Sequence, residues 1–300
     1  TFKTVSRKAM VYVSGNDGFL HAFDATTGNE DWAYLPTPVL PNLYELATTN
    51  YAHRYYVDGS VVGGDVAVGS AWKTILVGGY GGGGKGYYAI DITDPTAPLA
   101  LWEFSDARMG LSYGNPIITK LPAGSTSSGG ADIAGKWVVL LTSGYNNATN
   151  LGSHDGQGIL YVLDAYTGTE YFRIYGCADQ TSDGSCAGSS GSPSGLAKIN
   201  NWVEDSLKNN TALYVYGGDL EGNLWRFDLA NKTAFAVANV AEPITVKPEL
   251  AEISGERVVL FGTGLFLQST DRSDGTKRSI YGIRDNPAAT STLTNVKTSG

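Results

Sequence analysis

An internal repeat constrains the fold of this chain more than any other feature. Each copy has an apolar strand, a glycine turn, a second strand that ends in aspartate, and then an aromatic residue. The clearest copy is VYVSGNDGFLHAFDATTGNEDW at residues 11–32, and related copies begin near residues 72, 137 and 213. Because one small sheet cannot bury both of its faces alone, such repeats predict sheets that pack against one another.

The spacing of the repeat predicts the size of each sheet. The aspartates that end the second strand of the first four copies lie about 60 to 75 residues apart, which leaves room for four short strands and their loops. Turn signals rather than helical periodicity separate the strands. We therefore predict an all-β fold, a quinoprotein-like β-propeller built from four-stranded blades.

We expect residues 1–300 to form a single propeller domain. Five repeats are recognisable, and they lie near residues 10–35, 57–105, 114–175, 195–236 and 243–286. The fifth is weaker, because Arg284 stands where the other copies have aspartate. The first lacks the strand that precedes it in the others, so a ring of six or seven blades would need more blades or strands from outside this chain.

The first copy also predicts how blades dock. It contains the pattern A-x-D-x-x-T-G-x-x-x-W, in which the aspartate and threonine side chains can close a turn while the tryptophan reaches the next blade. The third copy repeats this pattern with phenylalanine in the tryptophan position. The residues that we expect to have this structural role are Asp24, Thr27, Gly28, Trp32, Asp91, Trp102, Asp164, Thr167, Gly168, Phe172 and Asp228.

The charge and hydropathy of the chain argue against two classes of partner. The net charge is −8 and the sequence pI is about 4.9, and no cluster of Lys or Arg offsets this charge, so we expect no binding to nucleic acid. No apolar run approaches the roughly 18 residues needed to span a bilayer, so we expect no membrane span in this chain. The first residues lack the apolar stretch of a secretory signal, so we expect any signal to lie upstream in a longer precursor.

The two cysteines, Cys177 and Cys186, flank the segment ADQTSDGS inside a Gly/Ser-rich loop. We predict a local disulfide between them, which implies an oxidising compartment, and two free thiols on a flexible loop are the alternative. Their spacing matches no zinc-site pattern, and no histidine is near them in the sequence.

Catalytic motifs are sparse. The run GYGGGG at 79–84 satisfies G-x-G-x-x-G, but an alternating strand follows it where a dinucleotide site requires a helix, so we interpret it as a loop between strands. The histidines His21, His53 and His154 fall in different repeats, and no G-x-S-x-G elbow is present. We therefore expect no enzyme activity.

A quinoprotein dehydrogenase is the strongest enzyme alternative. Quinoprotein propellers share the tryptophan repeat, and they carry pyrroloquinoline quinone with a metal over the central channel. Members with that activity have two adjacent cysteines against the cofactor, whereas the two cysteines here are nine positions apart. The repeat therefore supports the fold rather than redox chemistry.

Three segments together resemble the C-terminal propeller of the PilC/PilY family. They are VDGSVVGGDVAVGSAWKTILVGGYGGGGKGYYAIDITDP at 57–95, GDLEGNLWRFDL at 218–229 and GTGLFLQSTD at 262–271. The resemblance implies a non-enzymatic factor that helps to assemble type IV pili, balances pilus extension against retraction, and promotes adhesion. It also implies export through the periplasm to the pilus tip or outer cell surface, with minor pilins and host or abiotic surfaces as partners. A periplasmic scaffold propeller without a pilus role is a third alternative.

The resemblance also raises calcium as a possible cofactor, because members of the family often carry an acidic loop before the GDL-x-GNLW motif. Alignment on that motif places Asp205, Leu207, Asn209 and Leu213 on the ligand positions. Only Asp205 and Asn209 could coordinate, so we expect weak binding at most, since calcium takes six to eight oxygen ligands. The alternative is a solvated loop or short helix at 202–210.

Long polar loops are the candidate adhesive surface. The two most prominent are residues 121–135 and 176–195, and no Arg-Gly-Asp tripeptide is present in the chain. Loops tolerate variation while the blades hold them in place, so we expect adhesion to use them.

Overall fold

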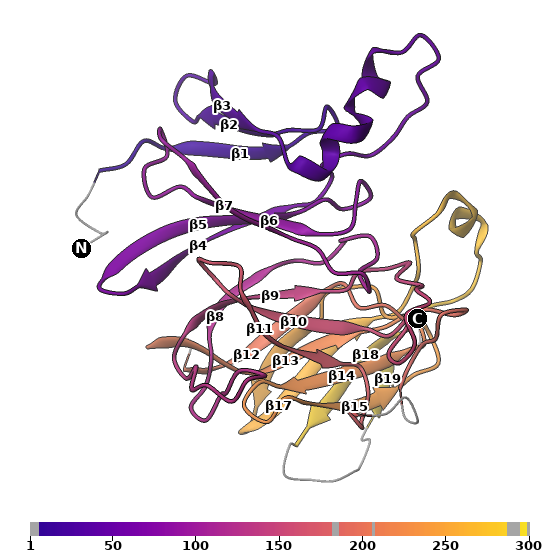
Figure 1. The fold of residues 1–300 in the computed structure, drawn as a ribbon. Coiled ribbons are helices and arrows are strands. Elements are labelled where there is room, and N and C mark those ends of the chain that lie inside the picture. The colour runs from indigo at the N-terminus through magenta and orange to yellow at the C-terminus, as the bar shows by residue number, and fades with distance from the viewer. Residues whose placement is uncertain (1–5, 182–185, 206–207, 287–294, 299–300) are drawn as a thin grey trace.

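The computed structural model describes residues 6–181, 186–205, 208–286 and 295–298. Within these residues, consecutive strands pair in antiparallel sheets that follow one another in chain order (Figure 1). The predicted all-β propeller architecture is confirmed. No helix among the described residues has the length and apolar character that crossing a membrane would require.

The first sheet has three strands, as the missing strand of the first repeat suggests. They are β1 (Met10–Ser14), β2 (Leu20–Asp24) and β3 (Glu30–Tyr34). The second sheet contains β4 (Val61–Val68), β5 (Ala71–Gly79), β6 (Tyr87–Asp91) and β7 (Leu99–Phe104).

The third and fourth sheets are joined into one eight-stranded sheet. The third contains β8 (Ile117–Lys120), β9 (Trp137–Thr142), β10 (Ile159–Asp164) and β11 (Glu170–Tyr175). The fourth contains β12 (Ile199–Asp205), β13 (Asn209–Gly218), β14 (Asn223–Asp228) and β15 (Thr233–Asn239). A single parallel pairing, Thr211 with Lys120, links β13 to β8.

The fifth sheet contains β16 (Glu249–Ile253), β17 (Glu256–Gly262), β18 (Ile280–Asp285) and β19 (Asn295–Thr298). In the described part of the chain, the connections contain the 3-10 helices η2 (Thr37–Ala47) and η3 (Ser269–Ser273).

Two sequence predictions in the last two repeats were wrong in detail. Residues 202–205 belong to strand β12 and residues 209–210 to β13, so this segment is a hairpin rather than a solvated loop or short helix. Asp285, not Arg284, is the aspartate of the fifth repeat, since it ends β18 and pairs with Arg257. Arg284 lies on the exposed face of the strand, whereas Asp285 is buried, and this alternation sets the register.

Apolar clusters fill the space between successive sheets. Between the second and third sheets, for example, Ile75 and Val77 of β5 pack in one cluster with Val139 of β9 and Tyr161 of β10. Similar clusters lie between the other consecutive pairs of sheets. Strands β6 and β10 are consequently buried on both faces apart from Asp164, which ends β10 and is half-buried. This is the radial packing that a propeller requires.

Aromatic side chains fasten the first three of these interfaces. The indole N–H of Trp32 in the first sheet donates to the Pro95 carbonyl in the second at 2.8 Å. The indole N–H of Trp102 in the second sheet donates to the Ala165 carbonyl in the third at 3.2 Å. Phe172 has no such donor, and it lies in the apolar cluster shared by the third and fourth sheets.

The repeated aspartates close the turns that follow them. Asp24 accepts hydrogen bonds from the backbone N–H groups of Thr26 and Thr27. Asp164 and Asp228 each accept two backbone N–H groups in the same way. These are the side-chain-closed turns that the sequence pattern predicts.

The interface between the fourth and fifth sheets adds a polar fastening to its apolar cluster. Arg226 of β14 pairs with Asp285 of β18, and both side chains are buried. The hydroxyl of Tyr216 donates to the same carboxylate at 2.6 Å. Phe235, which pairs with Arg226 across the sheet, remains 39% exposed and stacks on the guanidinium. A buried ion pair therefore accompanies the apolar contacts here.

The strand order places two kinds of connection on opposite faces of the molecule. In an antiparallel meander, successive connections leave from alternate ends. The connections between sheets lie on the same face as the connections between the second and third strands of each blade. We call this face the loop face. The aspartate turns lie on the other, which we call the turn face. Figure 1 shows the η2 segment and the β17–β18 connection projecting on the same side.

A matched pair of glycines tests the docking contact. Gly168 and Gly28 have φ values of 72° and 74°, so alanine should strain both backbones alike. A Cβ at Gly168 would lie 2.5 Å from Cγ of Trp102, whereas one at Gly28 would meet nothing within 4 Å. We expect Gly168→Ala to lower the free energy of unfolding by about 1–3 kcal/mol more than Gly28→Ala. Equal losses in urea unfolding of the two variants would contradict this contact.

The turn aspartates predict a loss of stability in acid. A hydrogen bond from Lys8, followed by those from the N–H groups of Thr27 and Thr26, lowers the pKa of Asp24 from 3.8 to about 2. Since the pKa is lower in the folded state, this stabilisation is present above about pH 4 and disappears as the pH falls toward about 2. Asp24→Asn keeps an acceptor oxygen but loses the charge. Its melting temperature should fall less steeply over this range than that of the unsubstituted chain, and parallel curves would refute the assignment.

Candidate functional site

The η2 segment forms an arm that is anchored at its base on the loop face. Val39 is 5% exposed and packs in the cluster between the first two sheets. The backbone N–H of Thr37 donates to Glu103 at 2.7 Å, and the hydroxyl of Tyr56 donates to the Asn42 carbonyl at 3.1 Å. These contacts tie the arm to the propeller.

The outer surface of this arm is apolar and aromatic. Its exposed large side chains are Leu40 at 52%, Tyr44 at 67%, Leu46 at 38%, Tyr51 at 45% and Tyr55 at 46%. We count residues 37–55 of the connection between β3 and β4 as the η2 arm, and all five side chains lie in it. Exposed apolar side chains that gather in one part of an otherwise folded domain mark interaction sites.

The glycine-rich loop at 79–84 packs beside this arm. A Cβ placed at Gly82 would lie 2.9 Å from the hydroxyl of Tyr113 and 3.1 Å from Cδ2 of Tyr55. Strand β6 follows the loop directly, so no helix begins there to receive a pyrophosphate. The segment thus serves as a close-packed connection between β5 and β6.

The structure joins Cys177 and Cys186 in a disulfide on the loop face. His154 lies beside it, with Nδ1 4.0 Å from the sulfur of Cys177. Its ring stacks on that of Tyr175 with centroids 3.8 Å apart. Gln157 is also close, since its Oε1 is 2.9 Å from the Cys177 sulfur. One ring nitrogen of His154 and the sulfurs of the two cysteines lie within 4.8 Å of one another.

Sequence reasoning missed His154 because 23 residues separate it from Cys177. The signal was present in the hairpin of the third repeat. Ile159 of β10 pairs with Tyr175 of β11, so residues just before Ile159 lie beside those just after Tyr175. Alignment of the two strands would have brought the histidine and the cysteine together.

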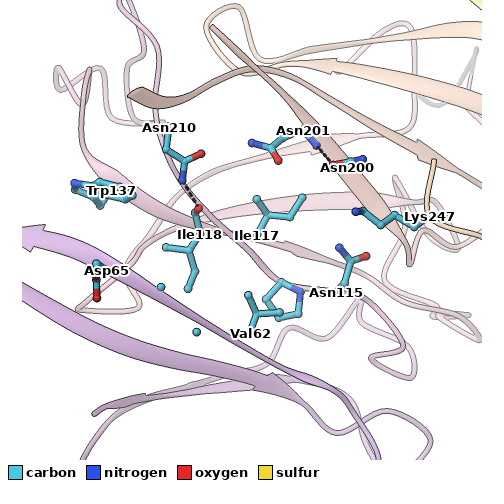
Figure 2. Close-up of a pocket in the computed structure, with 13 residues that line it drawn as sticks. Val62, Asp65, Asn115, Ile117, Ile118, Trp137, Asn200, Asn201, Asn210 and Lys247 are labelled. Atoms are coloured by element: carbon cyan, nitrogen blue, oxygen red, sulfur yellow. Dashed lines mark hydrogen bonds between the residues drawn. The ribbon is translucent and has the colours of Figure 1, made fainter. Parts of the chain in front are cut away.

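A cavity of about 380 Å³ lies along the inner strands (Figure 2). Its charged lining residues are Asp65 and Lys247, and the asparagines among its other lining residues are Asn115, Asn200, Asn201 and Asn210. The second, third and fourth sheets contribute to this wall from β4, β8 and β12.

Several of these asparagines connect neighbouring sheets. The amide of Asn115 accepts from the N–H of Ile199 and donates to its carbonyl, both at 3.0 Å. The amide of Asn210 donates to the Ile118 carbonyl at 2.9 Å, which Figure 2 shows as a dashed line. The side chain of Asn200 donates to the Pro248 carbonyl at 2.9 Å. Amide side chains thus add hydrogen bonds between neighbouring sheets along this wall.

The proposed calcium residues lie at the turn-face end of the β12–β13 hairpin, where Asp205 pairs with Asn209. The ammonium of Lys208 is 3.0 Å from the Asp205 carboxylate. The side-chain oxygen of Asn209 accepts the N–H of Thr211. Leu207 lies outside the described residues. The ammonium of Lys208 competes with a cation for this carboxylate, so weak calcium binding at most remains our prediction for Asp205 and Asn209.

The two loops expected to carry adhesion differ in position. Residues 121–135 connect β8 to β9 on the turn face, and Leu121 and Ile133 within them are buried. Residues 176–195 lie between β11 and β12 on the loop face, and of these the structure describes 176–181 and 186–195. Only the second loop shares a face with the η2 arm.

Radially packed sheets with docked aromatic residues and an amide-lined inner wall define a β-propeller. A family model described as the PilY1 beta-propeller domain matches residues 1–236. The chain therefore belongs to the PilY1 β-propeller family, and the resemblance to PilC/PilY proteins is confirmed.

Individual relatives agree with this assignment. The chain is 32% identical to the type IV pilus biogenesis factor PilY1 of Pseudomonas aeruginosa PAO1, over 93% of this chain and 25% of that protein. It is 34% identical to a PilY1 homolog of Xylella fastidiosa, over 93% of this chain and 21% of that protein. The crystal structure of the P. aeruginosa PilY1 C-terminal domain matches with a TM-score of 0.72 and 30% identity, over 94% of this chain and 58% of that chain. The chain thus spans a quarter or less of these two curated relatives.

Calcium titration tests the interpretation of the β12–β13 hairpin. Because Lys208 already lies on Asp205, we expect calorimetry of metal-free protein to show no micromolar calcium site there. Lys208→Ala is the control variant, because it removes the ammonium group that competes with calcium for the Asp205 carboxylate. A micromolar site that Asp205→Ala abolishes would show that the hairpin does bind calcium.

Proposed function

We propose that this chain is a non-enzymatic module of a type IV pilus assembly factor. In this role it supports the balance between pilus extension and retraction, and it attaches to surfaces or host cells through its loop face. Membership of the PilY1 family supports the pilus role. The observation that carries the adhesive role is the exposed aromatic surface of the η2 arm on a rigid propeller.

The physical properties of the arm suit protein or surface contact. Tyrosine offers a large amphipathic contact area at low cost in conformational entropy. Tyr44, Tyr51 and Tyr55 present such area, and the anchored base of the arm limits the ordering that binding would require. Minor pilins and host or abiotic surfaces are the partners that we propose for this face.

The proposed location is the pilus tip or outer cell surface, after export through the periplasm. The Cys177–Cys186 disulfide is consistent with an oxidising compartment. These cysteines are nine positions apart, so they differ from the adjacent pair typical of quinoprotein dehydrogenases. That difference supports the non-enzymatic proposal.

Matched double variants in the producing organism test the role of the arm. Tyr44→Ser with Leu40→Ser removes side chains that are 67% and 52% exposed on the loop face. Leu99→Ser with Ile253→Ser removes ones that are 57% and 50% exposed at strand ends on the turn face. We expect the arm variant to reduce surface attachment or surface pilin several-fold and the control variant to reduce neither.

Attachment and surface pilin should be measured separately, because a loss of attachment at normal pilin levels assigns the arm to adhesion. A loss of both assigns it to assembly. Normal values of both in the arm variant would refute the proposed surface.

A further inference from the structure

A histidine lies beside the Cys177–Cys186 disulfide, and a structural disulfide does not require one. His154 has a φ of 65°, in the left-handed region that few residues other than glycine adopt. Its ring lies nearly parallel to that of Tyr175, with 12° between the planes. Nδ1 lies 2.9 Å from Oε1 of Gln157 and 4.0 Å from the sulfur of Cys177, so the backbone, the stacking and the amide together hold the imidazole beside the disulfide.

The same three side chains are a familiar set of ligands for zinc. A disulfide sulfur is a poor ligand, whereas a thiolate binds zinc strongly at about 2.3 Å and an imidazole nitrogen binds it at about 2.0–2.1 Å. In a tetrahedral site these lengths place sulfur and nitrogen about 3.6 Å apart. Nδ1 of His154 and Sγ of Cys177 are 4.0 Å apart, so the pair needs little movement to share one ion.

We propose that the reduced form of this loop binds a zinc ion through Cys177, Cys186 and His154. Gln157 Oε1, 2.9 Å from the Cys177 sulfur, or a water molecule would complete the tetrahedron. The disulfide and the metal exclude each other, because each uses the same two sulfur atoms.

The redox step is a two-electron thiol–disulfide exchange. A dithiol reductant attacks the sulfur of Cys186, which is half-buried, whereas that of Cys177 belongs to a fully buried residue. The S–S bond breaks, the reductant leaves as a disulfide, and two thiols remain. Zinc then displaces the two thiol protons as it binds.

Cobalt(II) is a suitable probe, because thiolate ligation in a tetrahedral site gives it visible absorption. The chain is reduced with a dithiol, freed of reductant without oxygen, and titrated with cobalt and then with zinc. We expect one equivalent to bind to the reduced chain and none to the disulfide form at this site. The sheet circular dichroism should be the same in both forms.

His154→Asn is the informative variant, since asparagine tolerates a positive φ but lacks the imidazole. We expect it to weaken zinc binding by roughly tenfold or more, with the sheet spectrum retained. His53→Ala, in the η2 arm, is the matched control and should bind like the unsubstituted chain. Bound zinc should also slow re-formation of the disulfide by oxidised glutathione.

Three results would overturn the proposal. The reduced chain could unfold, it could bind no metal at one equivalent, or His154→Asn could bind as tightly as the unsubstituted protein. Each would mean that the histidine only packs against the disulfide.

Discussion

The second, third and fourth sheets of this chain are packed between neighbours on both faces, and the other features of the structure depend on that packing. The inner side chains of β6 and β10 are inaccessible to solvent because apolar clusters lie on either side of them. Trp32 and Trp102 extend this burial across sheet boundaries, and their indole N–H groups add one directed hydrogen bond each. Removal of one sheet from its neighbour would expose an apolar face to water, which is costly.

This packing gives the turn face and the loop face different roles. The aspartate turns must keep their shape, because the docked aromatic side chains rest on them. The connections on the loop face do not have this structural role, so they can include the η2 arm and the disulfide loop. The family is named for pilus biogenesis, and a rigid support with exposed connections is suited to contacts with other proteins or surfaces.

Local patterns made the architecture predictable, and long-range contacts limited what else could be foreseen. The turn at Asp24 depends on nearby residues, so one repeat reveals it. Trp32 docks on Pro95, 63 residues away, and this contact is predictable because the same unit recurs in the next sheet. The ion pair between Arg226 and Asp285 links residues 59 apart, and a charged residue between Trp225 and Phe227 gives no indication of its partner. The strand pairing that brings His154 to the disulfide is similarly hidden until the hairpin register is known.

The central claim is that docked aromatic side chains hold adjacent sheets together. Hydrogen exchange of a Trp102→Ala variant tests this claim most directly. Loss of the indole should open the boundary between the second and third sheets. Backbone amides of β7 and of the 164–169 turn should exchange faster, while those of β13 and β14 keep their protection. Uniform acceleration throughout the chain, or no change at the boundary, would contradict the account.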